Sequence, residues 1–263
     1  IYGLPKQTIN SVKETRKKIV NLDPDRIHFL CMEHRSDVYK HQKAYNEKDL
    51  PSMMDKVKMY DESVKFFENS GYTRIGLHKF AKEGDILTKY KKEEKLYRNP
   101  NGYSPGWSYN MLAVGPSATG KLGNYYFQNL YSLENYEKAV RSNQIPIIRE
   151  KNMDKNDRIR HRVIMDLMSY ESIDLNKFYN LNKISFAEYF KSELNRLKLI
   201  ENEGFLIFNK QENKYRVTKT GEHFINNICH IFDGYQEYQY ASHREFKDGA
   251  ESFDRAAALK KNI

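Results

Sequence analysis

The chain has 263 residues, of which 39% are hydrophobic and 30% charged, and its formal net charge at pH 7 is +9. It can bury a sizeable core, and no apolar run approaches the roughly 18 residues of a membrane-spanning helix, which excludes a helical membrane protein. The first residues lack the basic region and cleavage site of a signal peptide, so we expect a soluble cytoplasmic protein. The positive charge favours an anionic partner: nucleic acid, acidic lipid or a small polycarboxylate.

The opening residues, Ile1 and Tyr2 followed by Gly-Leu-Pro, are typical of a strand end, so we expect the rest of that strand upstream. Residues 26–32 (RIHFLCM) predict a buried strand, residues 52–71 an amphipathic helix stopped by a glycine, and residues 72–81 (YTRIGLHKFA) another strand. This alternation predicts a mainly parallel sheet covered by helices. Chemistry in such folds gathers at the carboxyl ends of strands, here CMEHR, HKFA and GPSATG.

The second half has a different pattern. Residues 157–170 carry apolar side chains at helical spacing and predict a packing helix. Residues 185–228 predict a helix, a strand, a polar turn, a second strand and a final helix entered after Thr220 and Gly221, an order that resembles a winged-helix module. Nucleic-acid binding is therefore an alternative, although it is disfavoured because the recognition helix mixes basic with acidic residues: Lys191, Arg196 and Lys198 with Glu188 and Glu193.

Local motifs alone give no complete active site. The stretch GPSATGK is similar to a phosphate-binding loop, but Leu122 stands where that motif requires Ser or Thr. The eight histidines are scattered and form no H-E-x-x-H motif. Cys31 and Cys229 lie too far apart in sequence for a local metal-binding pair. Nucleotide hydrolysis and a zinc site are therefore disfavoured.

Eight sequence blocks taken in order carry a stronger signal: YGLPKQT, LDPDRI, DLPSMMDK, SGYTRIGLHKFA, LYRNPNGY, VGPSATGKLGNYYFQN, RHRVIMDLM and TGEHFINNICHIFDGY. Together they resemble oxygen-independent coproporphyrinogen III oxidase, also called coproporphyrinogen dehydrogenase. The resemblance extends from Ile1 to about Tyr240 and is nearly free of gaps. It implies an α/β fold in which residues 1–125 form the C-terminal part of an incomplete radical S-adenosylmethionine barrel. Residues 126–263 would then form a mainly helical domain with a winged-helix-like hairpin.

The resemblance also implies a reaction and its cofactors. Members of this family hold a [4Fe-4S] cluster on a C-x-x-x-C-x-x-C motif and use S-adenosylmethionine to make a 5′-deoxyadenosyl radical. The radical starts the oxidative decarboxylation of two propionates of coproporphyrinogen III to vinyl groups, giving protoporphyrinogen IX. Both an electron donor and an electron acceptor are required. Two distant cysteines cannot hold the cluster, so we expect the ligands in an N-terminal half before Ile1 and no activity from this segment alone.

Candidate site residues follow from the resemblance and from their positions near predicted strand ends. Glu33 and Thr119 match positions near S-adenosylmethionine, where the family usually has a small residue and an isoleucine. The substrate carries four propionates, so four cations are candidate propionate partners: Arg35, Lys79, Arg98 and Lys121. Each of these cations could equally be a solvated surface charge.

Some positions depart from the family pattern. His78 and Lys79 stand where the family commonly has an Asp-His pair, and Asn110 replaces an Asp. These changes remove a carboxylate charge and a titrating ring near the expected site. They leave open a second hypothesis, a divergent tetrapyrrole- or haem-binding relative without the decarboxylase activity.

Overall fold

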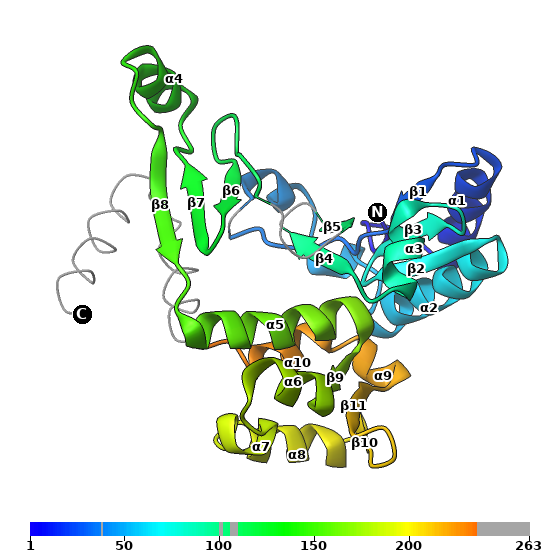
Figure 1. The fold of residues 1–263 in the computed structure, drawn as a ribbon. Coiled ribbons are helices and arrows are strands. Elements are labelled where there is room, and N and C mark those ends of the chain that lie inside the picture. The colour runs from blue at the N-terminus through cyan, green and yellow to red at the C-terminus, as the bar shows by residue number, and fades with distance from the viewer. Residues whose placement is uncertain (38, 100–101, 106–109, 236–263) are drawn as a thin grey trace. The chain divides into compact units, whose positions relative to one another are not determined.

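The computed structural model describes residues 1–37, 39–99, 102–105 and 110–235 (Figure 1). The chain divides into two compact units, one comprising Ile1–Ser70 and the stretch from Asp233, the other Gly71–Phe232. The division at residue 125 that the resemblance implies stays a prediction. Among the described residues, no helix combines the length and the apolar composition needed to span a bilayer.

The described residues of the first unit form two long helices, one short strand and two 3-10 turns: α1 (Ile9–Asn21), β1 (Arg26–His28), η1 (Lys40–Ala44), η2 (Glu47–Asp49) and α2 (Met53–Asn69). Helix α1 begins after Thr8, which forms a capping box with Ser11. Helix α2 begins after Ser52 and ends before Gly71, whose φ of 88° cannot continue a helix. The helix predicted over residues 52–71 is therefore confirmed.

The opening residues are part of a parallel bridge, as their strand-like sequence predicts. The Tyr2 amide donates to the Leu30 carbonyl at 2.8 Å, and the Met32 amide donates to the Tyr2 carbonyl at 2.7 Å. The Tyr2 ring stacks on Phe29 with 4.7 Å between ring centroids, and Phe29 packs edge-on against Phe67 of α2. These three rings are buried, so the first residues are fixed by apolar packing as well as by hydrogen bonds.

The second unit starts with three hairpin-like segments, whose elements are β2 (Tyr72–Gly76), β3 (Lys79–Lys82), α3 (Ile86–Lys92), β4 (Leu96–Asn99), β5 (Gly102–Pro105), β6 (Thr119–Leu122), β7 (Tyr125–Asn129), α4 (Leu133–Arg141) and β8 (Ile147–Asn152). It continues with α5 (Lys155–Tyr170), β9 (Ser172–Asp174), α6 (Leu175–Asn182), α7 (Phe186–Tyr189), α8 (Leu194–Asn202), β10 (Leu206–Asn209), β11 (Lys214–Val217), α9 (Lys219–Glu222) and α10 (Ile225–His230). All strand ladders within this unit are antiparallel.

The segment YTRIGLHKFA corrects one prediction. It forms an antiparallel hairpin of β2 and β3, where the sequence predicted a single strand of a parallel sheet. The reason is local: Leu77 has a φ of 41°, and with His78 it makes the turn that pairs Gly76 with Lys79. An apolar run cannot by itself distinguish one long strand from two short strands joined by a tight turn.

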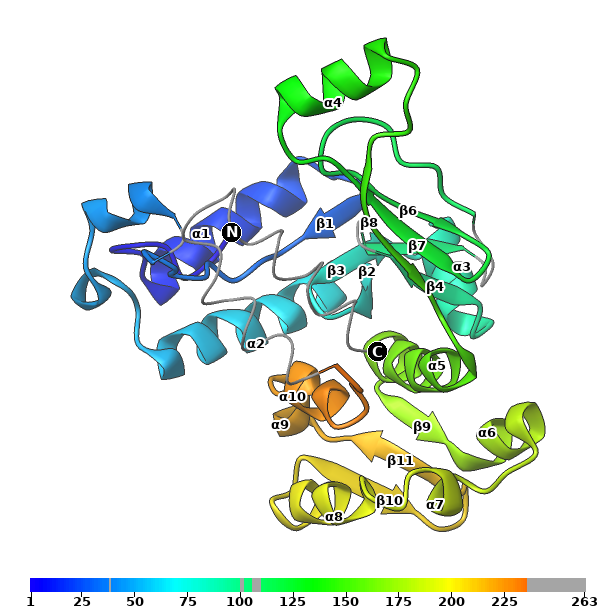
Figure 2. The same ribbon diagram turned by 90° about the vertical axis from the view of Figure 1, so that its left-hand side faces the viewer.

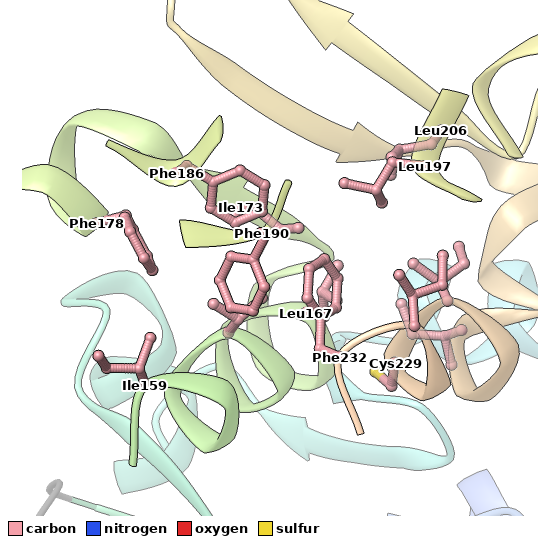
Figure 3. Packing of buried hydrophobic residues seen from close by; sticks show 14 residues of the cluster. Ile159, Leu167, Ile173, Phe178, Phe186, Phe190, Leu197, Leu206, Cys229 and Phe232 are labelled. Atoms are coloured by element: carbon pink, nitrogen blue, oxygen red, sulfur yellow. The ribbon is translucent and has the colours of Figure 1, made fainter. Parts of the chain in front are cut away.

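The helical part of the second unit packs around α5 (Figure 3). Ile159 and Leu167 on α5 are buried at the spacing that predicted a packing helix. Phe186, Phe190 and Phe232 pack against one another, with ring centroids 4.8 to 6.0 Å apart. The final helix predicted after Thr220 and Gly221 corresponds to α10, and it is preceded by the short helix α9, which the Thr218 side chain caps by accepting from the Gly221 amide.

The sheet β6-β7-β8 and α4 form a segment without an apolar core of its own. Both views show α4 at the end of this sheet that is remote from α5 (Figures 1 and 2). Within the described residues 110–152, no hydrophobic side chain is fully buried, and three are more than 70% exposed: Leu112, Val114 and Ile145. The segment therefore presents apolar side chains to its surface.

Candidate functional site

Glu33 and Arg35 lie in one loop of the first unit, after the Tyr2–Cys31 bridge. Arg35 makes a two-point contact with the Asp37 carboxylate at 3.1 Å for each nitrogen-oxygen pair, and its second terminal nitrogen lies 3.6 Å from Glu33. These acidic partners raise the pKa of Arg35, with Asp37 contributing most. A propionate would have to compete with Asp37 for this guanidinium. The Glu33 carboxylate remains mostly exposed.

Gln42 holds this loop in place, a role that no local sequence pattern indicates. Its side-chain amide donates to the Glu33 carbonyl at 3.1 Å and accepts from the Arg35 amide, and its own carbonyl lies 3.3 Å from the His34 ring. Gln42 is buried, so its hydrogen bonds are protected from water. The backbone of residues 33–35 is therefore held by hydrogen bonds to Gln42.

Lys79 and Arg98 lie on neighbouring hairpins of the second unit. The Lys79 side chain lies directly on Gly102, where φ is 126° and a Cβ atom would overlap the lysine. Arg98 on β4 lies over the Tyr103 ring, 5.4 Å from its centroid. Burial raises the pKa of Tyr103 to about 12, and its hydroxyl donates to the Met168 carbonyl at 2.6 Å. Within the described residues Arg98 has no acidic partner.

Thr119 and Lys121 lie two residues apart on β6, so they share one face of the strand about 7 Å apart. The Lys121 ammonium donates to the Tyr97 hydroxyl at 2.9 Å, and this hydroxyl lies 2.8 Å from the hydroxyl of Tyr126. His161 on α5 lies beside both tyrosine rings, with centroids 6.3 and 6.1 Å away. We call Lys121, Tyr97, Tyr126 and His161 the Lys121 site.

His161 is the unusual member of this site. Burial, followed by the charges of Lys121 and Arg162, lowers its pKa to about 4, so the ring is neutral at pH 7. Its Nε2 atom is buried and has no hydrogen-bond partner within the described part of the chain. Sequence reasoning placed His161 on a packing helix and missed its relation to Lys121, because β6 and α5 are far apart in sequence.

Asn110 has a structural role. Its side-chain oxygen accepts from the Gly123 amide at 2.8 Å and thereby ties residue 110 to the turn between β6 and β7. An aspartate carboxylate could accept the same hydrogen bond, so the departure from Asp preserves the acceptor.

The two cysteines do not fit an iron–sulfur cluster. Cys31 is exposed in the first unit, whereas Cys229 is buried in the second and burial raises its pKa to about 12. Among the described residues, no group of three or more His, Cys, Asp or Glu side chains is placed to hold a metal ion. A [4Fe-4S] cluster needs several thiolates at one place, so this part of the chain does not supply its ligands.

Comparison with known proteins identifies relatives. The chain is 34% identical over 235 residues to an oxygen-independent coproporphyrinogen III oxidase of Helicobacter pylori and 32% identical to that of Escherichia coli K12, covering 89% of this chain and 51% of each relative. It is 30% identical to the oxidase of Thermostichus vulcanus, covering 72% of that protein. No protein-family model matches the chain. The chain spans about half the length of the first two relatives.

A solved structure agrees with the sequence comparison. Coproporphyrinogen III oxidase from E. coli, described as a radical S-adenosylmethionine enzyme, superposes with a TM-score of 0.81 at 32% identity, over 89% of this chain and 54% of that one. The chain therefore has the α/β fold of a radical S-adenosylmethionine enzyme. It belongs to the oxygen-independent coproporphyrinogen III oxidase family, which confirms the identification made from the eight sequence blocks.

Proposed function

We propose that this chain is a portion of an oxygen-independent coproporphyrinogen III oxidase that acts in porphyrin and haem biosynthesis in the cytoplasm. The reaction is the oxidative decarboxylation of two propionates of coproporphyrinogen III to vinyl groups, giving protoporphyrinogen IX. It requires an electron donor and an electron acceptor as partners. The family membership of the chain is the observation that carries this proposal.

In this proposal the chain binds substrate and S-adenosylmethionine. The ligands of the [4Fe-4S] cluster belong to the half of the family fold that this chain does not span. S-adenosylmethionine would contact Glu33 and Thr119. The exposed Glu33 carboxylate suits an ammonium or ribose hydroxyls. Thr119 is half-buried on β6 and offers backbone groups and one hydroxyl.

The four candidate propionate partners differ in what surrounds them. Arg35 is already engaged by Asp37, and Lys79 lies along Gly102. Arg98 and Lys121 contact tyrosines and, among the described residues, have no carboxylate partner. A substrate with four carboxylates therefore complements Arg98 and Lys121 best.

We also infer a winged-helix-like module within the helical part and an incomplete barrel formed with the rest of the family fold. The sheet order β10-β11-β9, with α6, α7 and α8 inserted between β9 and β10, supports the module. Two cations of the helical part are engaged by acids: Lys214 of the module by Asp174 at 2.9 Å, and Arg160 of the neighbouring α5 by Glu193 at 2.8 Å. Such pairing favours a packing role over nucleic-acid binding.

The exposed apolar side chains of residues 110–152 support a larger assembly. Leu112 and Val114 precede β6 and are 74% and 85% exposed. The chain spans about half the length of the H. pylori and E. coli relatives, and in this proposal the remaining half of the family fold covers these side chains.

The test is an anaerobic assay of the complete gene product with coproporphyrinogen III, S-adenosylmethionine and a low-potential reductant, with porphyrins separated after oxidation. Protoporphyrin formation supports the proposal. An intact cluster that cleaves S-adenosylmethionine but leaves coproporphyrinogen III unchanged would refute it. The His78-Lys79 pair favours one second candidate, a divergent tetrapyrrole-binding relative. Spectral titration with haem and coproporphyrin III distinguishes this candidate.

A further inference from the structure

The Lys121 site has more hydrogen-bond donors than acceptors. Lysine has three N–H donors and no acceptor, and one of those donors is directed at the Tyr97 hydroxyl. The ammonium also lies 4.6 and 5.6 Å from the ring centroids of Tyr97 and Tyr126. Among the described residues Lys121 has no carboxylate partner. The Lys121 residue is half-buried, and among the described residues the aromatic rings and one hydroxyl are what offset the charge of its ammonium.

Other half-buried cations of the same unit are treated differently. Arg74 lies 2.6 Å from Glu222, Arg160 lies 2.8 Å from Glu193, and each of these guanidinium groups thus has a carboxylate partner. Lys121, like Arg98, differs from these two structural cations in having no carboxylate partner among the described residues. A partly desolvated cation without a counter-ion is costly unless a ligand provides one.

The Tyr97 and Tyr126 hydroxyls add a further hydrogen-bond donor without an acceptor. A hydroxyl that accepts from a cation becomes a stronger donor, so we assign Tyr97 as the donor to Tyr126. The Tyr126 O–H is then left without an acceptor within the described residues. His161 Nε2 is a further buried nitrogen without a partner there, and it donates when it carries the ring proton.

We propose that Lys121, Tyr126 and His161 form a carboxylate-binding subsite, with Tyr97 holding the Lys121 ammonium and the Tyr126 hydroxyl in position. Three donors without acceptors suit one carboxylate group, whose two oxygens accept several hydrogen bonds. Lys121 lies on the same face of β6 as Thr119, the proposed S-adenosylmethionine contact. The identity of the bound group rests on the proposed function, under which the carboxylate is one propionate of the porphyrinogen.

The experiment uses the complete gene product and coproporphyrin III, the stable oxidised porphyrin with the same four propionates, followed by fluorescence titration. Lys121→Met should weaken binding about 10- to 100-fold, the loss expected for a charge-assisted hydrogen bond. Tyr126→Phe should weaken it about 3- to 10-fold and covers the case in which Lys121→Met fails to fold. Lys210→Met removes an exposed lysine with the same charge change and should leave affinity within twofold. The affinity for the tetramethyl ester of coproporphyrin III, in which every carboxylate is blocked, should be the same for the wild type and Lys121→Met.

A second measurement follows His161 directly by imidazole NMR. After burial, the positive charge of Lys121 is the next cause of the low His161 pKa, and a bound carboxylate would offset that charge. Saturating coproporphyrin III should therefore raise the pKa of His161 above its ligand-free value of about 4. If the site had only a structural role, the pKa of His161 would be the same with and without coproporphyrin III.

The outcomes separate this inference from the proposed function. If folded Lys121→Met and Tyr126→Phe variants bind coproporphyrin III as the wild type does while decarboxylation proceeds, the subsite is wrong and the function stands. If the wild type fails to bind coproporphyrin III and forms no protoporphyrin, both are wrong. An unchanged His161 titration in the complex overturns the three-donor subsite.

Discussion

We expect the ion pairs of Arg74 to contribute more to stability than any other ionic contact between β2 and the C-terminal helices of the second unit. Its guanidinium lies 2.6 Å from Glu222 of α9 and 3.6 Å from Glu171 at the end of α5. Lys91 lies 3.9 Å from the same Glu171 and donates to the Arg74 carbonyl at 2.8 Å. The Arg74 and Glu222 side chains are only 11% and 15% exposed, so removing the arginine leaves a carboxylate with little access to water.

We predict that Arg74→Met lowers the free energy of unfolding by about 3 kcal/mol, near the lower limit for breaking a buried ion pair because Lys219 still reaches Glu222. In a chain of this size that corresponds to a fall in Tm of roughly 6 to 12 °C. Lys219→Met is the matched control. It removes an exposed partner of the same glutamate and should cost less than about 1 kcal/mol.

The pH dependence provides a separate check on the same contact. Burial alone would raise the pKa of Glu222, but Arg74 and then Lys219 outweigh it and hold that pKa below its ordinary value. The stabilisation is therefore present above the unfolded pKa, about 4.3, and is lost as the pH falls through the lower folded value. Urea unfolding should show the gap between wild type and Arg74→Met closing below about pH 4. A gap that is constant with pH, or no larger than for Lys219→Met, would refute the reasoning.

Three further predictions concern single residues of either unit. Because burial lowers the pKa of His161 to about 4, wild-type stability should fall by about 2 to 3 kcal/mol relative to His161→Phe as the pH drops from 6.5 to 4 in urea unfolding; parallel pH profiles would contradict this. Gly120→Ala should lower Tm, by the equivalent of about 1 to 3 kcal/mol, because a Cβ there would lie 2.8 Å from the Met111 carbonyl; an unchanged Tm would show that the strand can shift. Iodoacetamide should label the exposed Cys31 before the buried Cys229, as peptide mass mapping of native protein can establish, and equal rates would contradict the burial of Cys229.

The sequence predicted the elements whose signal is local. Apolar spacing predicted α5, with Ile159 and Leu167 buried, and the polar start and glycine end predicted α2. The hairpin of β2 and β3 was missed because its turn depends on a positive φ at Leu77, a residue that rarely adopts one. A turn of this kind leaves no Gly or Asn at the decisive position, so the run of apolar residues reads as one strand.

Prediction from sequence is limited in the same way at the candidate site, where the decisive contacts join residues far apart in the chain. Cationic residues near strand ends can be recognised in the sequence, and Arg35 and Lys121 were equivalent candidates on that criterion. The structure distinguishes them by their neighbours: Asp37 lies two residues from Arg35 and engages it, whereas Lys121 contacts tyrosines from β4 and β7. Whether a cation is available to an acidic ligand depends on its counter-ions, and those are fixed by chain folding. The absence of a carboxylate within the described surroundings of Lys121 therefore argues for ligand binding more strongly than its positive charge alone.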